Sequence, residues 1–252
     1  MSKQIAFKLK QILKEVPNNS IFTSKWLQQK KISTSLISKY KKSNWIKSIG
    51  TGAYTKLNDK YDIDSAIYAL QNQLNLSIHI GGLSALSDKY SISQNVIFNS
   101  KTNLYGIKKE NLPKWFKTVF KDKYNIFLTD FLPKNLGIEN FDNNSFETKI
   151  SSMERSILEI LYLVPNVITT QTAYQTMEFL SALRPDLLQE LLKETKSIKV
   201  KRLFLYMAEK INYPWFEKLN IKKINLGNGI RKIVAGGKFD KKYKIVIDNI
   251  EQ

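Results

Sequence analysis

The chain has 252 residues and a formal net charge of +18, and its 42% hydrophobic content is that of a folded globular protein rather than a disordered basic tail. It contains no cysteine and one histidine, His79, which excludes disulfides, thiol catalysis and cysteine-ligated zinc and argues against a metal or other cofactor. No apolar run approaches the roughly 18–20 residues that span a bilayer, and the start is amphipathic, so we expect a cytoplasmic protein with no membrane partner.

Positive charge is concentrated at the two ends of the chain. The first sixty residues contain 13 lysines and two acidic residues, and the tail from 221 contains eight basic and three acidic residues, whereas the segments between are nearly balanced. This asymmetry indicates binding to a polyanion, and nucleic acid is favoured because lysine neutralises phosphates and releases their counterions. A lysine excess alone would be explained equally well by solubility. The positions of the lysines therefore decide between solubility and nucleic-acid binding.

The basic N-terminal end has the helix pattern of a helix-turn-helix. Residues 3–15 place apolar side chains at helical spacing. Thr23 is expected to cap a second helix over 24–29, and Ser33 a third helix running to about residue 42. The third helix would be the one that enters the major groove of DNA.

A β-hairpin is expected next, with strands in 45–49 and 53–57 joined by Gly50-Thr51-Gly52. Three helices followed by a hairpin form a winged helix. Such modules also serve as protein-binding domains, but charge on the groove-facing elements favours DNA. The side chains expected to reach base edges or phosphates are Lys25, Thr34, Ser35, Ser38, Lys39, Lys41, Lys42, Lys47 and Thr51.

The middle of the chain offers no catalytic motif. A helix is expected over 62–74, and strands over 77–80, 95–98 and 124–131. His79 is expected on the polar side of its strand. The Gly-Leu-Ser-Ala-Leu string at 82–86 is not a nucleophile elbow, and Gly81-Gly82 lacks the features of a phosphate loop. The polar stretch 139–149 is expected to be a connection.

The C-terminal part is expected to be helical at first and then to return to strand. Helices are expected over 153–163, 170–183, 186–193 and 197–210, and strands within 221–248. The fold class is therefore α+β, with a winged helix-turn-helix over 1–60 and a larger mixed α+β domain over 61–252, which could contain two subdomains divided near 139–150. Basic residues at the start of the fourth helix oppose its dipole, so we expect a partner or a nearby carboxylate there.

Several strings along almost the whole chain resemble the AbiEi family of antitoxins from abortive-infection, type IV toxin–antitoxin systems. They are Trp45–Ile49 with Gly50-Thr51-Gly52-Ala53-Tyr54, Ser77–Leu86, Ser151–Glu159, Leu183-Arg184-Pro185, Ser197–Leu205, Asn225-Leu226-Gly227 and Gly236–Tyr243. Their order and spacing carry the resemblance. The stretch after Leu86 departs from the Gly-Tyr-Ala-His-Tyr type of continuation found in many relatives.

The resemblance implies a phage-defence antitoxin that is not an enzyme. Its winged helix would bind inverted repeats in double-stranded DNA of its own promoter and repress transcription. Its C-terminal part would oppose a nucleotidyltransferase-like toxin without a stable complex. The implied antitoxin surface is basic and comprises Lys199, Lys201, Arg202, Arg231, Lys238, Lys241 and Lys242.

Two other functions remain open. The basic tail could grip a structured RNA such as tRNA and shield it, or the chain could be a transcription factor with no toxin partner. An enzyme is disfavoured because no carboxylate pair or metal-ligand spacing is present.

Overall fold

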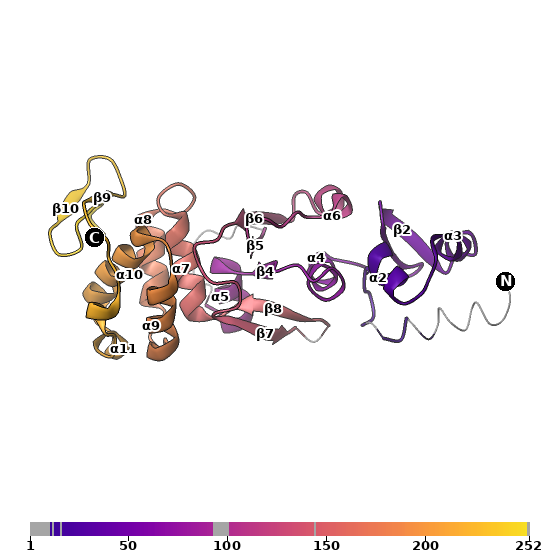
Figure 1. The fold of residues 1–252 in the computed structure, drawn as a ribbon, viewed down its shortest axis with the longest axis horizontal. Helices are drawn as coiled ribbons and strands as arrows, with labels where there is room; N and C mark the ends of the chain where they lie inside the picture. The colour runs from indigo at the N-terminus through magenta and orange to yellow at the C-terminus, as the bar shows by residue number, and fades with distance from the viewer. Residues whose placement is uncertain (1–10, 12, 16, 93–100, 144, 251–252) are drawn as a thin grey trace. The chain divides into compact units, whose positions relative to one another are not determined.

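The computed structural model describes residues 11, 13–15, 17–92, 101–143 and 145–250 (Figure 1). The expected helix over 3–15 and strand over 95–98 therefore lie largely outside the described residues. The chain forms two compact units that alternate along the sequence. Unit 1 is Met1–His79, Lys109–Asn125 and Asn140–Lys149, and unit 2 is Ile80–Lys108, Ile126–Glu139 and Ile150–Gln252. The domain boundary at residue 60 stays a prediction.

The N-terminal part of unit 1 is the expected helix-turn-helix with a hairpin. Its elements are β1 (Phe22–Thr23), α2 (Ser24–Gln29), α3 (Thr34–Lys42), β2 (Ile46–Gly50) and β3 (Ala53–Lys56). The strands form an antiparallel sheet in the order β1-β3-β2. Beneath it lies a small core of Leu13, Phe22, Trp26, Leu27, Ile32, Ile37, Tyr40 and Ile46.

The expected helix over 62–74 is confirmed, although its second half is π-helical. It consists of α4 (Ile63–Tyr68) and η1 (Ala69–Gln73), and Asp62 caps it by accepting a hydrogen bond from Ser65 N. The buried Gln73 amide ties η1 to β1: its Nε2 donates to the Ile21 carbonyl (2.6 Å), and its Oε1 accepts from Thr23 N (2.8 Å). Unit 1 also contains α6 (Lys114–Val119).

A five-stranded sheet runs in the order β6-β5-β4-β8-β7. Its strands are β4 (His79–Ile80), β5 (Thr102–Gly106), β6 (Tyr124–Leu128), β7 (Ile138–Asp142) and β8 (Glu147–Ser151). The expectation of a connection over 139–149 is wrong, because β7 and β8 occupy most of it. The placement of His79 on a polar face is also wrong, because its side chain is buried.

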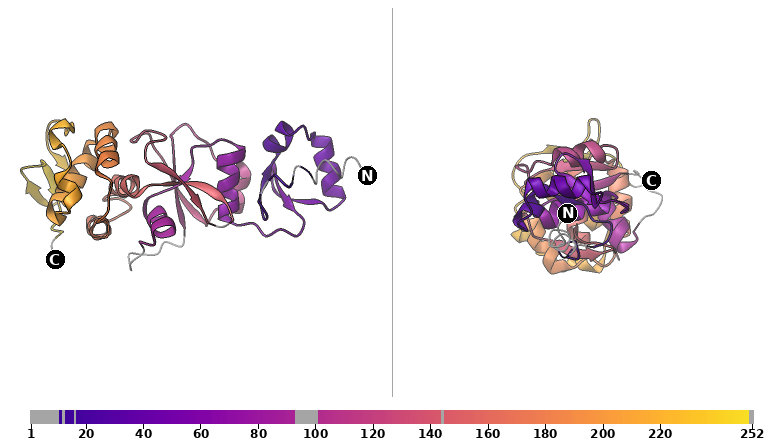
Figure 2. Two further views of the ribbon diagram at one scale, coloured as in Figure 1. Left: turned by 90° about the horizontal axis from the view of Figure 1, so that it is seen from below. Right: turned by 90° about the vertical axis from the view of Figure 1, so that its right-hand side faces the viewer.

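Unit 2 carries most of the helices and the larger hydrophobic core. Its helices are α5 (Gly82–Tyr90), α7 (Met153–Leu163), α8 (Thr170–Glu178), α9 (Pro185–Glu194), α10 (Ile198–Ile211) and α11 (Pro214–Glu217). Helices α8, α9 and α10 all pack on α7, and appear as the orange cluster in Figure 2. The α+β class is confirmed.

The chain ends in a short 3-10 turn and a three-stranded sheet. These are η2 (Ile221–Lys223), β9 (Arg231–Lys232), β10 (Lys238–Asp240) and β11 (Ile245–Ile247). Strand β11 lies in the centre, antiparallel to β10 and parallel to β9. Among the described residues, no helix has the length and apolar character needed to cross a membrane.

Candidate nucleic-acid interface

Local hydrogen bonds set the geometry of the helix-turn-helix. Thr23 Oγ1 accepts from Trp26 N (3.2 Å) at the start of α2, and Ser33 Oγ accepts from Leu36 N (3.3 Å) at the start of α3. Between the helices the backbone turns at Lys31, whose φ is positive. Both helices therefore begin where the sequence placed their caps, because a hydroxyl satisfies an otherwise unpaired N–H of the first turn.

Helix α3 separates an inward face from a polar outward face. Ile37 and Tyr40 are buried and Leu36 is half-buried against the core. The opposite face is exposed and carries hydroxyl and ammonium groups only. Its residues are Thr34, Ser35, Ser38, Lys39, Lys41 and Lys42. All three lysines lie in the last turn, where they complement the negative end of the helix dipole.

The other sequence-derived candidates lie on α2 and the wing. Lys25 on α2 and Thr51 at the hairpin turn are exposed. Lys47 on β2 is half-buried, and its Nζ donates to the Asp59 carbonyl (3.4 Å). Lys47 is thus less accessible than the other candidates.

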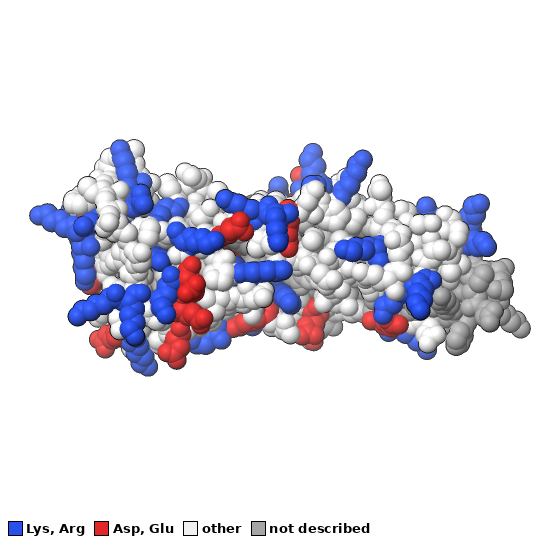
Figure 3. Space-filling model, in the orientation of Figure 1, with Lys and Arg blue, Asp and Glu red and all other residues white. Residues whose placement is uncertain are grey.

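The acidic residues near the winged helix are paired with other lysines. Glu15 forms an ion pair with Lys30, and Asp59 lies 4.0 Å from Lys56. Within the described part of the chain, no ion pair involves Lys39, Lys41 or Lys42. The face drawn in Figure 3 shows little red over the winged helix. The α3 face is therefore free to attract phosphates.

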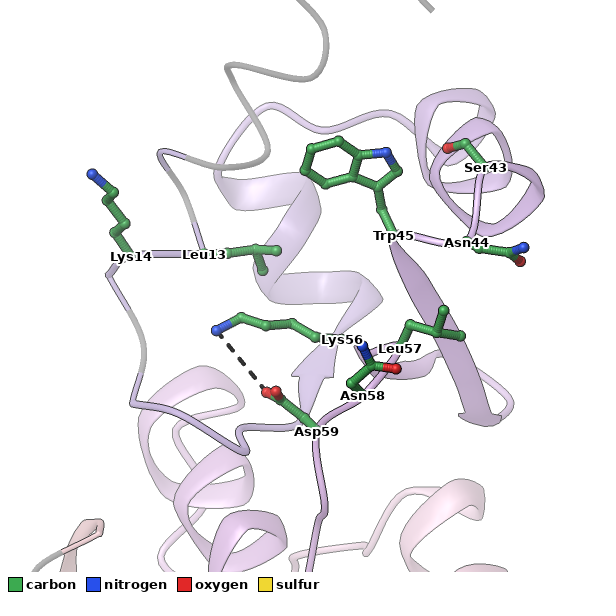
Figure 4. Close-up of a pocket in the computed structure, with 9 residues that line it drawn as sticks. All are labelled: Leu13, Lys14, Ser43, Asn44, Trp45, Lys56, Leu57, Asn58 and Asp59. Atoms are coloured by element: carbon green, nitrogen blue, oxygen red, sulfur yellow. Dashed lines mark ion pairs between the residues drawn. The ribbon is translucent and has the colours of Figure 1, made fainter.

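A groove that the sequence did not predict adjoins the end of α3 (Figure 4). It has a volume of about 660 Å³ and lies between the segments 13–14, 43–45 and 56–59. Two large apolar side chains line it while remaining exposed, Trp45 (40%) and Leu57 (41%). The sequence did contain a signal for the exposed Trp45. Side chains alternate along a strand, so Trp45 points outward if its neighbour Ile46 points into the core.

The C-terminal basic surface is smaller than the sequence suggested. Arg202 is 1% exposed and Lys201 4% exposed, so their assignment to a surface is wrong. The Arg202 guanidinium donates to the carbonyls of Leu226 (2.8 Å), Gly227 (3.0 Å), Gly229 (2.6 Å) and Lys244 (3.0 Å). Near the start of α10, four backbone carbonyls receive the positively charged guanidinium of Arg202.

Lys199 and Lys201 are held in the same way. Lys199 is half-buried and its Nζ donates to the carbonyls of Tyr162 (2.7 Å) and Val164. Burial lowers the pKa of its ammonium group. Lys201 Nζ donates to the Lys193 carbonyl (3.2 Å). Both side chains therefore form hydrogen bonds that connect α10 to neighbouring segments.

The remaining four candidates of this set are exposed on the C-terminal sheet and its loops: Arg231, Lys238, Lys241 and Lys242. Lys242 forms an ion pair with Glu209. Two large apolar side chains, Ile230 (59%) and Phe239 (43%), are exposed among them. The combination of cations with an exposed aromatic ring suits nucleobases as well as phosphates.

Two family models together match almost the whole chain. Residues 5–97 match the family described as "Transcriptional regulator, AbiEi antitoxin N-terminal domain", and residues 99–248 match "Transcriptional regulator, AbiEi antitoxin, Type IV TA system". The chain belongs to the AbiEi antitoxin family. Its role is accordingly that of an antitoxin and transcriptional regulator of a type IV toxin–antitoxin system.

One solved structure has a similar fold. The crystal structure of the RV2827C protein from Mycobacterium tuberculosis has a TM-score of 0.58 to this chain at 11% identity, covering 92% of this chain and 87% of that chain. At this identity the likeness concerns the fold alone. No curated protein matches the AbiEi chain in sequence.

The strings that carry the AbiEi resemblance build a buried polar network in unit 2. Glu159 Oε2 accepts from Gly82 N (3.0 Å) and Ser151 Oγ (2.8 Å), and Glu159 Oε1 accepts from Arg155 Nε (2.8 Å). A methyl group built on Gly81 would lie 2.3 Å from Glu159 Oε2. The glycine pair is therefore needed for close approach to a carboxylate, and not for binding a ligand phosphate.

A second buried carboxylate, Glu154, explains the Leu-Arg-Pro string. Arg184 Nε and its backbone N–H donate to Glu154 Oε1 (3.1 and 2.8 Å), and Arg184 Nη2 donates to Glu154 Oε2 (2.8 Å). Burial alone would raise the pKa of Glu154, but the hydrogen bonds from Arg184 hold this pKa below its ordinary value. Among the described residues, no cluster of His, Asp and Glu could hold a metal ion.

Proposed function

We propose that the winged helix represses the promoter of the protein's own operon by placing α3 in the major groove. The observation that supports this most is the exposed face of α3, where small hydroxyls lie beside lysines that have no acidic partner among the described residues. Hydroxyls allow close approach to base edges, and lysines reach phosphates. We further propose inverted repeats as the target, bound by two copies of the chain.

The test is binding to a duplex from the region upstream of the gene, compared with a scrambled duplex. Changing Lys41 and Lys42 together to Ala is expected to weaken binding to both duplexes and to reduce the slope of log affinity against log salt by about 0.9 per lost phosphate contact. Changing Ser35 or Ser38 to Ala should instead alter the preference between sequences. Equal affinity of the wild-type protein for both duplexes would refute the repressor role.

For the antitoxin role, we propose a nucleotidyltransferase-like toxin that is opposed without a stable complex. The exposed cations of the C-terminal sheet support a site there. A variant with Arg231, Lys238 and Lys241 changed to Ala is expected to lose protection of cells that express the toxin while keeping wild-type DNA affinity. Full protection by this variant would exclude the surface.

An RNA-binding role is the second candidate, and the exposed Phe239 among these cations favours it. Binding of labelled tRNA to the wild-type protein and to Phe239→Ala distinguishes RNA shielding from an antitoxin role that does not involve RNA. RNA shielding requires that the ring substitution weakens tRNA binding and protection together. A transcription factor with no toxin partner would repress normally and give no protection from any adjacent toxin gene.

A further inference from the structure

Helix α6 packs directly against strand β2 of the wing, within unit 1. The contact is made at Gly50, the last residue of β2. A methyl group built on Gly50 would lie 2.9 Å from Trp115 Cβ and 3.2 Å from Trp115 Cα. The wing and α6 backbones therefore approach as closely as a residue without a side chain allows.

An aromatic cluster fixes α6 in this position. Trp115, Phe116 and Phe120 are buried and pack edge-on or tilted against one another, with ring centroids 5.5–6.4 Å apart. Tyr61, which follows the wing in sequence, meets the edge of Phe120 at 6.2 Å. Rings of this size contribute much of the packing energy of such a small helix, and Trp115 joins this cluster to Gly50 of the wing.

The outward face of α6 and the segment just after it are cationic. Lys114, Lys117 and Lys121 are exposed, and Lys117 Nζ donates to the neutral Asn111 side chain (2.6 Å). Within the described ranges, no ion pair involves any of the three. The segment 109–123 holds five lysines and two acidic residues. This local excess was hidden in the nearly neutral average of the segment 61–150.

The length of strand β2 would allow α6 to contact the DNA backbone a few base pairs away from α3. Strand β2 has five residues and is about 17 Å long. It begins four residues after α3 ends and finishes at α6. Phosphates of one DNA strand follow each other at about 3.4 Å along the axis, so this length corresponds to about five base pairs. Long, flexible lysine side chains are suited to phosphates rather than to base edges.

We propose that α6, together with Lys121 just after its end, is a second contact to the DNA backbone, which extends the interface of the winged helix along the duplex through Lys114, Lys117 and Lys121. The proposal rests on DNA binding by α3 and the wing. A merely solvated face would leave DNA affinity unchanged when the lysines are removed. The α6 contact supplies affinity without sequence preference.

The experiment compares two triple variants of the full chain with equal loss of charge. The first changes Lys114, Lys117 and Lys121 to Ala. The matched control changes Lys218, Lys222 and Lys223, exposed lysines of unit 2, to Ala. Fluorescence anisotropy is measured with a duplex of about 30 base pairs from the upstream region, at salt concentrations from about 0.05 to 0.3 M. It gives the affinity and the slope of log affinity against log salt. Thermal unfolding checks that each variant is folded.

We expect the α6 variant to bind at least about tenfold more weakly at 0.1 M salt, with a slope shallower by about 0.9 per lost contact, and the control to bind almost as the wild type does. Trimming the duplex by about six base pairs at each end should weaken the wild-type protein more than the α6 variant. Equal losses in both triple variants would overturn the proposal, because only total charge would then matter.

The Lys41/Lys42 double variant separates this proposal from the one on which it rests. If that variant loses binding while the α6 variant keeps the wild-type affinity and slope, the α6 contact is refuted and the proposed role of α3 stands. If the wild-type protein itself fails to bind the duplex, DNA binding by the winged helix is refuted as well.

Discussion

The guanidinium of Arg202 connects α10 to the loop 226–229 and to Lys244 through hydrogen bonds to four backbone carbonyls. The sequence gives no indication of burial here, since the four carbonyls that receive its guanidinium belong to residues 24 to 42 positions away. Three of those residues lie in the loop 226–229, which no periodicity places next to α10. The planar guanidinium matches this ring of acceptors, as the point charge of a lysine would not.

Arg202→Met is therefore expected to destabilise the protein by about 3 kcal/mol, because four backbone carbonyls lose the buried guanidinium that donates to them. Urea unfolding measures the change. Arg231→Met is the control, since Arg231 is exposed and should change stability by less than about 0.5 kcal/mol. Arg202→Lys should recover little of the loss. Wild-type stability of Arg202→Met would contradict the structural role.

The Arg184–Glu154 pair gives stability a definite dependence on pH. Hydrogen bonds from Arg184 lower the pKa of the buried Glu154 below its ordinary 4.5 in the folded state. The unfolded chain therefore takes up the proton more readily, and the stabilisation is present above about pH 4.5 and is lost as the pH falls below it. Arg184 also donates to Glu139, whose pKa is lowered in the same direction.

Arg184→Gln is expected to destabilise the protein by about 2 kcal/mol at neutral pH, because Glu154 must then be buried without its cation. The difference from the wild type should shrink as the pH falls below about 4.5, because the unfolded wild-type chain then takes up the proton and the wild type loses this stabilisation. Urea unfolding from pH 4 to 7 measures this. Lys196→Gln, at an exposed lysine, controls for the loss of charge. A difference independent of pH would contradict the assignment.

At the scale of elements, helices that begin at a local capping residue were predicted correctly, whereas strands that depend on pairing with other segments were not. The starts of α2 and α3 were predicted because one hydroxyl, Thr23 or Ser33, caps each helix. Strands β7 and β8 were missed because their polar residues resemble a connection. Asn143 closes the turn between them, with its side chain accepting from Ser145 N and Phe146 N.

Part of the candidate site could also be predicted from sequence. The α3 face was correctly separated from the core because Ile37 and Tyr40 fix the rotation of the helix. The lysines of α6 were not recognised, since α6 has only six residues and too little length for a helical period to show. The groove beside Trp45 depends on segments 13–14 and 56–59 that are distant in sequence.

At the scale of the whole molecule, the winged helix has its supports outside its own sequence. Gln73 hydrogen bonds to Ile21 and Thr23, and Trp115 covers Gly50. Removing them exposes two buried backbone groups and one face of the wing.

A fragment of residues 1–60 is therefore expected to be less stable than the same region in the full chain, by at least about 2 kcal/mol. Amide hydrogen exchange of residues 20–56 compares the two directly. Gln73→Ala in the full chain isolates the amide contribution and should reproduce part of the loss. Identical protection in the fragment and the full chain would establish 1–60 as an independent domain.

The alternation of the two units along the sequence has a consequence during translation. Unit 1 takes its last segment from Asn140–Lys149, so the ribosome must add almost ninety residues after the winged helix before the unit is whole. At about 5–20 residues per second, this takes roughly 5–20 s. During that interval the nascent winged helix lacks its full support and is open to proteases or chaperones, so the delay limits how soon after synthesis a new molecule can act.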